Sequence, residues 1–227
     1  MVLQIVKFKI KICGVTNPAD ALAAIDAGAD AIGLNFYRGS KRCVSVDVAR
    51  QIVETIGHQA DKIGVFVNEP ADHIRQRCHD TGLHLIQLHG DEPPEFLRLL
   101  NQDHDIIRAR QLDERGLSAI ENDLQACSDL SGCCPDAILV DSALAGHFGG
   151  TGQTADWQLL ANYRAVLGDV PLILAGGLTP ANVAEAIRVV RPDAVDVASG
   201  VESAPGRKDS AKMRDFVAAA QAAFAAL

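Results

Sequence analysis

Short apolar segments alternate along the chain with segments whose apolar positions recur at helical spacing. Residues 46–56 are an example of the helical kind, with Val46, Ala49, Ile52 and Ile56 on one face. The expected strands are residues 8–13, 31–36, 62–67, 83–88, 105–110, 136–140, 171–175 and 194–197. The expected helices are residues 19–27, 46–56, 71–81, 93–100, 116–126, 156–160 with its continuation, 180–190 and 210–226.

The order of these elements predicts the fold class. Short apolar strands that alternate with helices favour parallel pairing, with both faces of the sheet covered. Eight such units without a long linker predict an α/β protein, a single (β/α)8 TIM barrel spanning residues 1–227 as one domain. An open doubly wound sheet is the alternative, but Gly14 stands alone where that fold has a Gly-x-Gly-x-x-Gly turn. A barrel of this kind carries its functional residues at the C-terminal ends of the strands.

Composition and charge narrow the classes of partner. The chain is 48% hydrophobic and 22% charged, and its formal net charge of -8 argues against binding nucleic acid or an anionic membrane. A negative net charge still allows a local positive pocket that binds a small anion. No apolar stretch is long enough to cross a bilayer and the start lacks a signal-peptide pattern, so we expect a cytoplasmic protein.

The cysteines and histidines show no metal-binding pattern. The six cysteines match no zinc spacing, and a chain of 227 residues does not need disulfides to fold, so reduced thiols are expected. Cys133 and Cys134 follow Ser131 and Gly132 and precede Pro135, which predicts exposed thiols in a loop at 127–135. No metal ion and no cofactor are implied.

The first strand ends at a residue able to do chemistry. Lys9, Lys11 and Cys13 alternate with apolar residues, and Gly14 then permits a tight turn before Pro18 starts a helix. Cys13 is therefore predicted at the mouth of the barrel. The alternative is a small buried apolar residue. A thiol has a pKa of about 8.5, and Lys11 or the start of the next helix would lower it.

Glycine clusters follow the last three strands. They are residues 149–152 with Gly150 and Gly152, the pair Gly176 and Gly177, and Gly200 preceded by Ser199. Glycines let consecutive backbone N–H groups approach the oxygens of a phosphate, which in such barrels commonly lies beside the loops after strands seven and eight. Turns alone also need glycine, but three clusters at the same end of consecutive strands favour a phosphate site.

Two aspartates stand at or near strand ends. Asp141 follows the apolar strand 136–140, where it is either a turn cap or a general acid whose pKa is raised near the apolar rim. Asp196 lies inside the last strand, where an uncompensated charge is costly. We expect Asp196 to pair with Lys11 on the neighbouring first strand or to bind a ligand hydroxyl.

Two further positions are candidates for substrate contacts. The loop at 37–43 carries three positive charges, including Arg42, and is either a solvated basic loop or a clamp for a carboxylate. Gln87 and His89 alternate at the end of the fourth strand and so share a face. A single histidine is more often structural than catalytic.

Several segments together resemble one enzyme family. They are Lys-Ile-Cys-Gly-Val-Thr at 11–16, Ser-Lys-Arg at 40–42, Val-Phe-Val-Asn at 65–68, Gln-Leu-His-Gly-Asp-Glu at 87–92, Leu-Val-Asp-Ser at 139–142, Gly-Gly-Thr-Gly at 149–152, Ala-Gly-Gly-Leu at 175–178, Asp-Val-Ala-Ser-Gly-Val-Glu at 196–202 and Pro-Gly-Arg-Lys-Asp at 205–209. This set resembles phosphoribosylanthranilate isomerase, a (β/α)8 enzyme of tryptophan biosynthesis, over essentially the whole chain. The resemblance implies an Amadori rearrangement of a small-molecule phosphoribosyl substrate without a cofactor, by a monomer or a homodimer.

The resemblance also implies roles for the candidate residues. Cys13 would be the general base that removes the proton from C2 of the sugar, and Asp141 the general acid that protonates the ring oxygen. Arg42 would hold the anthranilate carboxylate. The remaining implied substrate contacts are Gln87, His89, Asp196, and the phosphate-loop residues Gly150, Gly152, Gly176, Gly177, Ser199 and Gly200.

Two departures and two alternatives accompany this interpretation. Lys41 stands where many family members have proline, and Ala198 where serine is common. The related phosphosugar isomerase of histidine biosynthesis performs the same rearrangement, but it has an aspartate where this chain has Cys13. A non-catalytic phospho-ligand binder would keep the glycine clusters, but it would have no reason to keep both Cys13 and Asp141.

Overall fold

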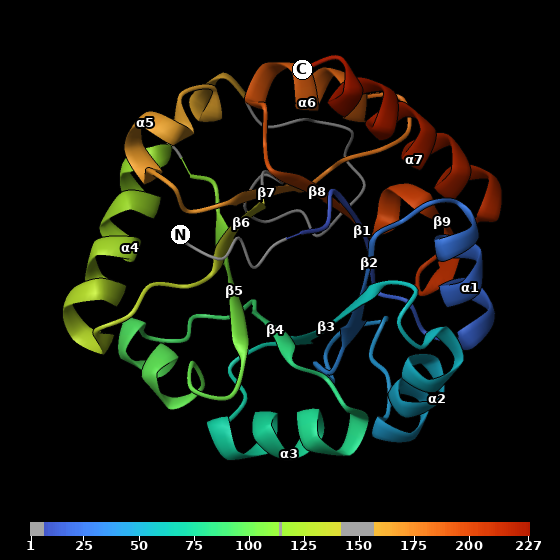
Figure 1. The fold of residues 1–227 in the computed structure, drawn as a ribbon, viewed down its shortest axis with the longest axis horizontal. Helices are drawn as coiled ribbons and strands as arrows, with labels where there is room; N and C mark the ends of the chain where they lie inside the picture. Colours follow the sequence, from blue (N-terminus) through green and yellow to red (C-terminus); the bar gives the residue numbers. More distant parts are fainter. Residues whose placement is uncertain (1–6, 114, 142–156) are drawn as a thin grey trace.

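The fold is described from a computed structural model, which covers residues 7–113, 115–141 and 157–227. Eight parallel strands, β1 to β8, form a closed barrel in sequence order, which confirms the predicted architecture. Figure 1 shows the strands at the centre and the helices around them. The strands are β1 (Ile10–Cys13), β2 (Ala31–Asn35), β3 (Asp61–Phe66), β4 (Leu85–Leu88), β5 (Asp105–Gln111), β6 (Ala137–Asp141), β7 (Leu172–Ala175) and β8 (Ala194–Val197).

Helices cover the outer face of this barrel. The α-helices are α1 (Pro18–Asp26), α2 (Val46–Ile56), α3 (Ala71–Thr81), α4 (Leu117–Ser131), α5 (Tyr163–Leu167), α6 (Val183–Val190) and α7 (Ser210–Ala225). Short 3-10 helices are η1 (Pro94–Leu99), η2 (Trp157–Leu160) and η3 (Ser199–Val201). The apolar positions that predicted α2 do face the barrel, because Ala49, Ile52 and Ile56 are fully buried.

The barrel interior is apolar over most of its depth. Alternate strand residues point inward, and small and large side chains from different strands fill the space together. This inner cluster consists of Phe8, Ala31, Ile63, Ile107, Ala109, Ala137, Leu139, Ile173, Ala175 and Ala194, with Leu85 packed against it. Polar side chains enter the interior at Lys11, Gln87 and Asp196, all of which are buried.

Several segments differ from the sequence-based prediction, among them two helices and the loop between α4 and β6. The helix expected at 93–100 is the 3-10 helix η1, which is short and starts with Pro94 directly after Pro93. Helix α4 continues beyond the expected end at 126, because Ile120, Leu124 and Cys127 extend one buried face. The loop expected at 127–135 is accordingly shorter.

The two neighbouring thiols of that loop differ from each other. Cys134 is exposed as expected, whereas Cys133 is half-buried, so the prediction of exposed thiols was wrong for Cys133. The Ser131 hydroxyl accepts a hydrogen bond from the backbone N–H of Cys133 and lies 3.2 Å from its Sγ. This turn folds the thiol of Cys133 back against the end of α4.

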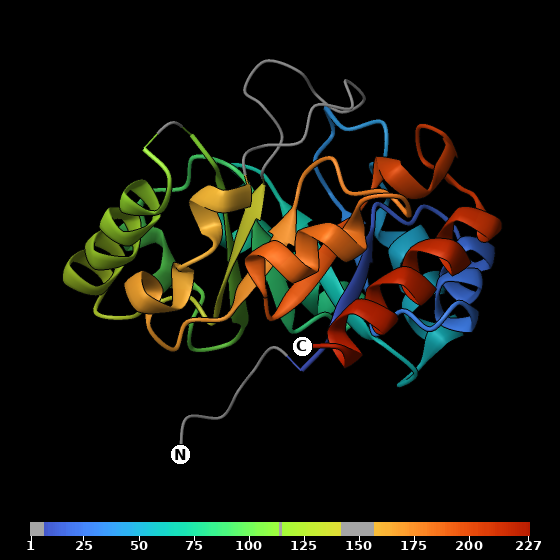
Figure 2. The same ribbon diagram turned by 90° about the horizontal axis from the view of Figure 1, so that it is seen from above.

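A hairpin that the pattern did not predict follows β8. It consists of β9 (Glu202–Ala204) and β10 (Arg207–Lys208), which pair antiparallel directly before α7. The hairpin and the loop after β2 gather at the same end of the barrel in Figure 2, beyond the C-terminal ends of the strands. Closure of the barrel places Lys11 of β1 opposite Asp196 of β8.

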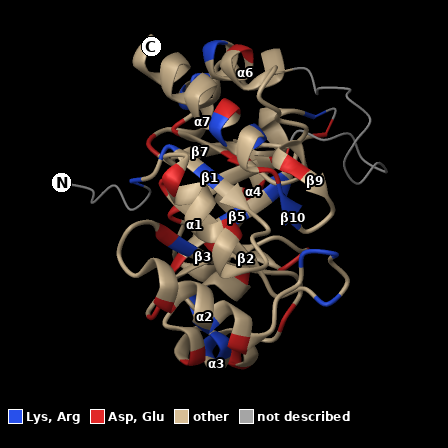
Figure 3. Cartoon of the chain, turned by 90° about the vertical axis from the view of Figure 1, so that its right-hand side faces the viewer, with Lys and Arg blue, Asp and Glu red and all other residues tan. Residues whose placement is uncertain are grey.

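The outer surface carries charges of both signs. Figure 3 shows basic and acidic residues interspersed along α2 and α3. Exposed pairs such as Arg50 with Asp47 and Arg75 with Asp72 occur there, and each contributes little to stability. Among the described residues, no helix has both the length and the apolar character needed to span a bilayer.

Candidate active site

Cys13 and Asp141 are the last residues of β1 and β6. Since all eight strands are parallel, both side chains belong to the same rim of the barrel. β7 and β8 lie between β6 and β1 on one side of the closed sheet. A Cβ at Gly33 of β2 would lie 2.7 Å from the Cys13 sulfur, so this glycine makes room for the thiol.

A buried lysine connects three strands below the rim. Lys11 Nζ lies 3.0 Å from Asp196 Oδ1, which confirms the predicted pair, and donates a hydrogen bond of 2.9 Å to Gln87 Oε1. Burial by itself would lower the pKa of Lys11, but Asp196 and the neighbouring Cys13 outweigh it and raise that pKa above its usual value. Lys11 is therefore a cation at neutral pH, enclosed in the barrel.

The amide of Gln87 fixes the protonation of His89. Lys11 can only donate hydrogen bonds, so its contact with Gln87 Oε1 leaves the Gln87 Nε2 group to donate to His89 Nδ1, 2.6 Å away. Burial lowers the pKa of His89, although the charge of Asp141 opposes that change. The result is a neutral imidazole whose remaining proton is on Nε2.

We expect this protonation state to be visible by NMR. In long-range ¹H–¹⁵N spectra at pH 7, His89 should show the pattern of the neutral Nε2–H tautomer, with the signal assigned by its loss in His89→Asn. In Gln87→Glu, a carboxylate that only accepts hydrogen bonds should move the proton to Nδ1. An imidazolium pattern in the unmodified protein, or an unchanged tautomer in Gln87→Glu, would contradict this relay.

Cys13 is held as a thiol in the substrate-free protein. Burial raises the pKa of Cys13, while the positive charges of Lys11 and Lys208 lower it and Asp196 adds to the increase. Lys11 thus does lower the pKa of Cys13, as expected, but the net direction is upward because burial outweighs it. The reason is that removing the thiolate from water destabilises it by more than the nearby cations stabilise it.

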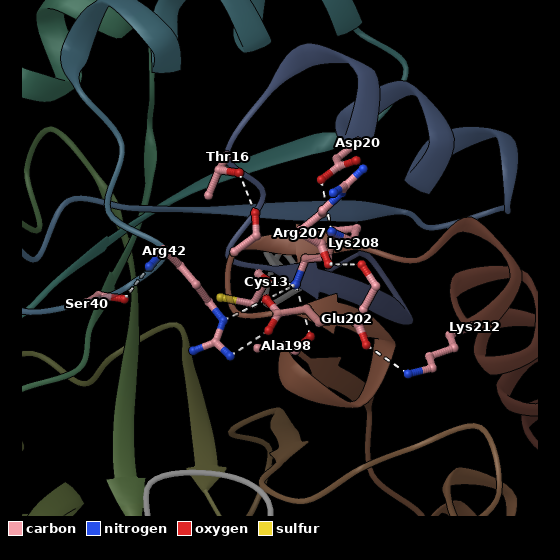
Figure 4. A network of polar contacts seen from close by, with 12 residues as sticks. Cys13, Thr16, Asp20, Ser40, Arg42, Ala198, Glu202, Arg207, Lys208 and Lys212 are labelled. Carbon is pink, nitrogen blue, oxygen red and sulfur yellow. Dashed lines mark hydrogen bonds and ion pairs between the residues drawn. The ribbon is translucent and has the colours of Figure 1, made fainter.

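Arg42 lies beside the thiol and is paired with an acid. Its Nε and Nη2 atoms donate hydrogen bonds of 2.7 Å each to the two carboxylate oxygens of Glu202. Figure 4 shows this pair next to Cys13. The Arg42 side chain packs on the turn after β1, because a Cβ at Gly14 would lie 2.4 Å from Arg42 Cδ. Gly14 also has a φ of 72°.

Lys208 joins this pair to the ends of β1 and β8. Its ammonium donates hydrogen bonds to the carbonyl oxygens of Cys13 and Ala198, at 2.6 and 3.0 Å, and to Glu202 Oε1 at 3.0 Å. The Lys208 side chain is fully buried. The Thr16 hydroxyl also donates a hydrogen bond to the carbonyl oxygen of Gly206, which lies between β9 and β10. These contacts fix the hairpin against the loop after β1 (Figure 4).

The loops after β7 and β8, where the sequence predicts a phosphate site, require glycine at several positions. Gly176 and Gly177 have φ values of 89° and 63°, which favour glycine. A Cβ at Gly200 would lie 1.9 Å from the carbonyl oxygen of Leu178, so the two loops touch at a position that only glycine allows. Ser199 is exposed and opens η3. Gly150 and Gly152 lie outside the described residues.

The structure thus brings Lys11 and five of the predicted site residues into one connected network. Lys11 contacts Gln87 and Asp196, and Gln87 contacts His89. Cys13 interacts electrostatically with Lys11 and Asp196, and Asp141 with His89.

Two residues of the site were missed by sequence reasoning. In the sequence, Glu202 and Lys208 are marked only by belonging to the family-like segments 196–202 and 205–209. A stronger signal was the placement of both charges in a short segment directly after the last strand. Among the described residues, no cluster of three or more His, Cys, Asp or Glu side chains is arranged to hold a metal ion.

Comparison with known proteins identifies one family. A family model described as N-(5'-phosphoribosyl)anthranilate (PRA) isomerase matches residues 10–219. The chain is 44% identical over 209 residues to the N-(5'-phosphoribosyl)anthranilate isomerase of Trichlorobacter lovleyi, covering 92% of this chain and 96% of that protein. It is 42% identical over 219 residues to the enzyme of that name from Neisseria meningitidis serogroup C, covering 94% and 97%.

Solved structures agree with this result. The crystal structure of phosphoribosyl anthranilate isomerase from Thermotoga maritima matches with a TM-score of 0.84 at 38% identity, covering 95% of this chain and 99% of that one. A phosphoribosyl anthranilate isomerase in complex with reduced 1-(o-carboxyphenylamino)-1-deoxyribulose 5-phosphate matches with a TM-score of 0.80 at 38% identity, with the same coverage.

Proposed function

This chain belongs to the N-(5'-phosphoribosyl)anthranilate isomerase family, and we propose that Cys13 and Asp141 carry the first two proton transfers of its reaction. The enzyme is an isomerase of tryptophan biosynthesis. It converts N-(5-phosphoribosyl)anthranilate to 1-(2-carboxyphenylamino)-1-deoxyribulose 5-phosphate, an aldose–ketose (Amadori) rearrangement. The observation that supports the proposed roles is the placement of a thiol and a carboxyl group on two strands of one rim.

The reaction needs an acid first and a base second. Asp141 gives a proton to the oxygen of the furanose ring, the bond from that oxygen to C1 breaks, and the nitrogen lone pair forms a C1=N iminium. Cys13 then removes the proton from C2, and its electrons form a C1=C2 enamine. Loss of the proton from the C2 hydroxyl and protonation at C1 complete the ketone. The positive iminium also favours the Cys13 thiolate at the moment when the base is needed.

The remaining contacts hold the two ends of the substrate. Arg42 binds the anthranilate carboxylate, since a guanidinium matches a planar carboxylate with parallel hydrogen bonds. The backbone N–H groups around Gly177, Ser199 and Gly200 bind the phosphate. His89 donates from Nε2 and Asp196 accepts from sugar hydroxyls. Gly150, Gly152, Gly176 and Gln87 complete the proposed set, with Gln87 acting through His89.

The base role predicts a specific pH dependence. Burial raises the pKa of Cys13 in the free enzyme, and a base must be deprotonated to act. In the unmodified enzyme, the simultaneous need for a protonated acid offsets the gain in thiolate as pH rises. In Asp141→Asn, which lacks that acid, we therefore expect the residual kcat/KM, which reports free-enzyme groups, to keep rising with pH beyond the ordinary titration range of a thiol. Initial rates across neutral and alkaline buffers test this. A plateau of kcat/KM below pH 8 in this variant would show that a different group limits the reaction.

A direct activity test is the fluorescence of phosphoribosylanthranilate. Adding the protein should make the substrate signal decay, and a signal that decays no faster than in buffer would contradict the activity itself. A cytoplasmic location, a monomeric or homodimeric state, the single domain over 1–227, and the absence of nucleic-acid or membrane partners remain predictions from the sequence.

A further inference from the structure

We infer that Glu202 is a positioning residue of this enzyme, which fixes Arg42 in the orientation that selects substrates carrying a carboxylate on the aromatic ring. The inference rests on the proposed contact between Arg42 and the anthranilate carboxylate. It assigns to the β9–β10 hairpin a part in substrate selection.

The geometry of the pair leaves one edge of Arg42 for a second carboxylate. Glu202 occupies the Nε–Nη2 edge of the guanidinium with two hydrogen bonds of 2.7 Å. A guanidinium has five N–H donors in one plane, so the Nη1–Nη2 edge can bind another carboxylate in the same plane. Glu202 is 4% exposed at its side chain, whereas Arg42 is 26% exposed, so the pair opens to solvent on the arginine side.

The position of the pair matches this role. Arg42 packs over Gly14, the residue after the proposed base, and interacts electrostatically with Cys13. A substrate carboxylate on the outer edge of the guanidinium is thereby anchored close to the thiol. An arginine without a partner would have to give up its rotamer freedom each time substrate binds, and Glu202 removes that cost in advance.

Lys208 prevents Glu202 from neutralising Arg42. Three acceptors surround Lys208 Nζ, and only a charged ammonium has three hydrogens to give them. Arg42, Glu202 and Lys208 together therefore carry one net positive charge, which remains for an incoming anion. Without the Glu202 charge, Lys208 would face two carbonyl groups in a buried site and would favour its neutral form, so the attraction for an anion would not increase.

The test compares two substrates that differ only in the carboxylate. Phosphoribosylanthranilate and the corresponding phosphoribosylaniline, made from aniline and ribose 5-phosphate, are assayed side by side by chromatography, and the ratio of their kcat/KM values is the readout. In Glu202→Gln we expect this preference to fall about tenfold, mainly through KM for the carboxylated substrate. Asp47→Asn, which neutralises the acid of an exposed ion pair on α2, is the matched control and should leave the ratio unchanged.

Arg42→Ala separates this inference from the proposed function on which it rests. If Arg42→Ala keeps the preference, the proposed carboxylate contact of Arg42 is wrong. If Arg42→Ala loses the preference but Glu202→Gln keeps it, only the role of Glu202 is wrong. We expect Arg42→Ala combined with Glu202→Gln to show the same ratio as Arg42→Ala alone, because Glu202 acts through Arg42.

A second variant covers the case in which Glu202→Gln fails to fold. Glu202→Asp keeps the negative charge beside Lys208 but is shorter by one methylene, which withdraws the carboxylate from Arg42. We expect the preference to fall in this variant as well, with far-UV circular dichroism like that of the unmodified enzyme. A folded Glu202→Asp variant with an unchanged preference would overturn the inference.

Discussion

Replacing Cys13 by serine is expected to reduce kcat by about 100-fold to 10,000-fold, the range typical of losing a general base. A hydroxyl is a much weaker acid than a thiol, so serine has almost no basic form to accept the C2 proton. The space beside Gly33 accepts the smaller oxygen, and the barrel should fold normally. The measurement is the decay of substrate fluorescence under saturating and limiting substrate.

Two controls make the Cys13→Ser result specific. Cys134→Ser removes an exposed thiol in the loop after α4 and should retain full activity. Binding of reduced 1-(o-carboxyphenylamino)-1-deoxyribulose 5-phosphate should change little in Cys13→Ser, since this ligand has no iminium group to make its C2 proton acidic and therefore does not react with a base. Full activity of Cys13→Ser would assign the base to another group.

Replacing Asp141 by asparagine is expected to reduce kcat over the same range, because an amide cannot transfer a proton to the ring oxygen. The change has a second consequence at His89. The charge of Asp141 raises the pKa of His89 against the effect of burial, so that pKa should fall further in Asp141→Asn. Fluorescence decay tests the first effect and NMR titration of His89 the second.

The two readouts for Asp141 separate its possible roles. A loss of activity with retained binding of the reduced product analogue and a lower pKa of His89 supports the acid role. A variant with activity within threefold of the unmodified enzyme would remove Asp141 from the reaction, whatever happens at His89. A variant that no longer binds the product analogue would show that Asp141 holds the substrate instead of reacting with it.

Much of the barrel follows from local pattern. Alternating short apolar strands and amphipathic helices were sufficient to predict the (β/α)8 architecture, and strand parity placed Lys11 facing inward opposite Asp196. The start of α1 was also predictable, since Pro18 lies in its first turn and Asn17 caps it. These features depend on neighbours along the chain or on strand alternation, which the sequence displays directly.

The contacts that the pattern missed depend on distant residues. Arg42 and Glu202 are 160 positions apart, and they meet through a hairpin whose strands are too short to leave a periodic signal. The direction of the Cys13 pKa depends on how far burial exceeds the effect of Lys11 and Lys208, which no spacing reveals. The orientation of the Gln87 amide likewise follows only from its neighbours in space.

The junction between β1 and β8 ties this enzyme's chemistry to the completion of folding. Lys208 reaches the carbonyl oxygen of Cys13 across 195 positions, and Asp196 meets Lys11 only when the last strand closes the sheet. During synthesis Cys13 leaves the ribosome before Asp196 and Lys208. Its contacts with them can form only after nearly the entire barrel has been made. A nascent or truncated chain therefore lacks an assembled site, and the protein becomes catalytically active only once the barrel has closed.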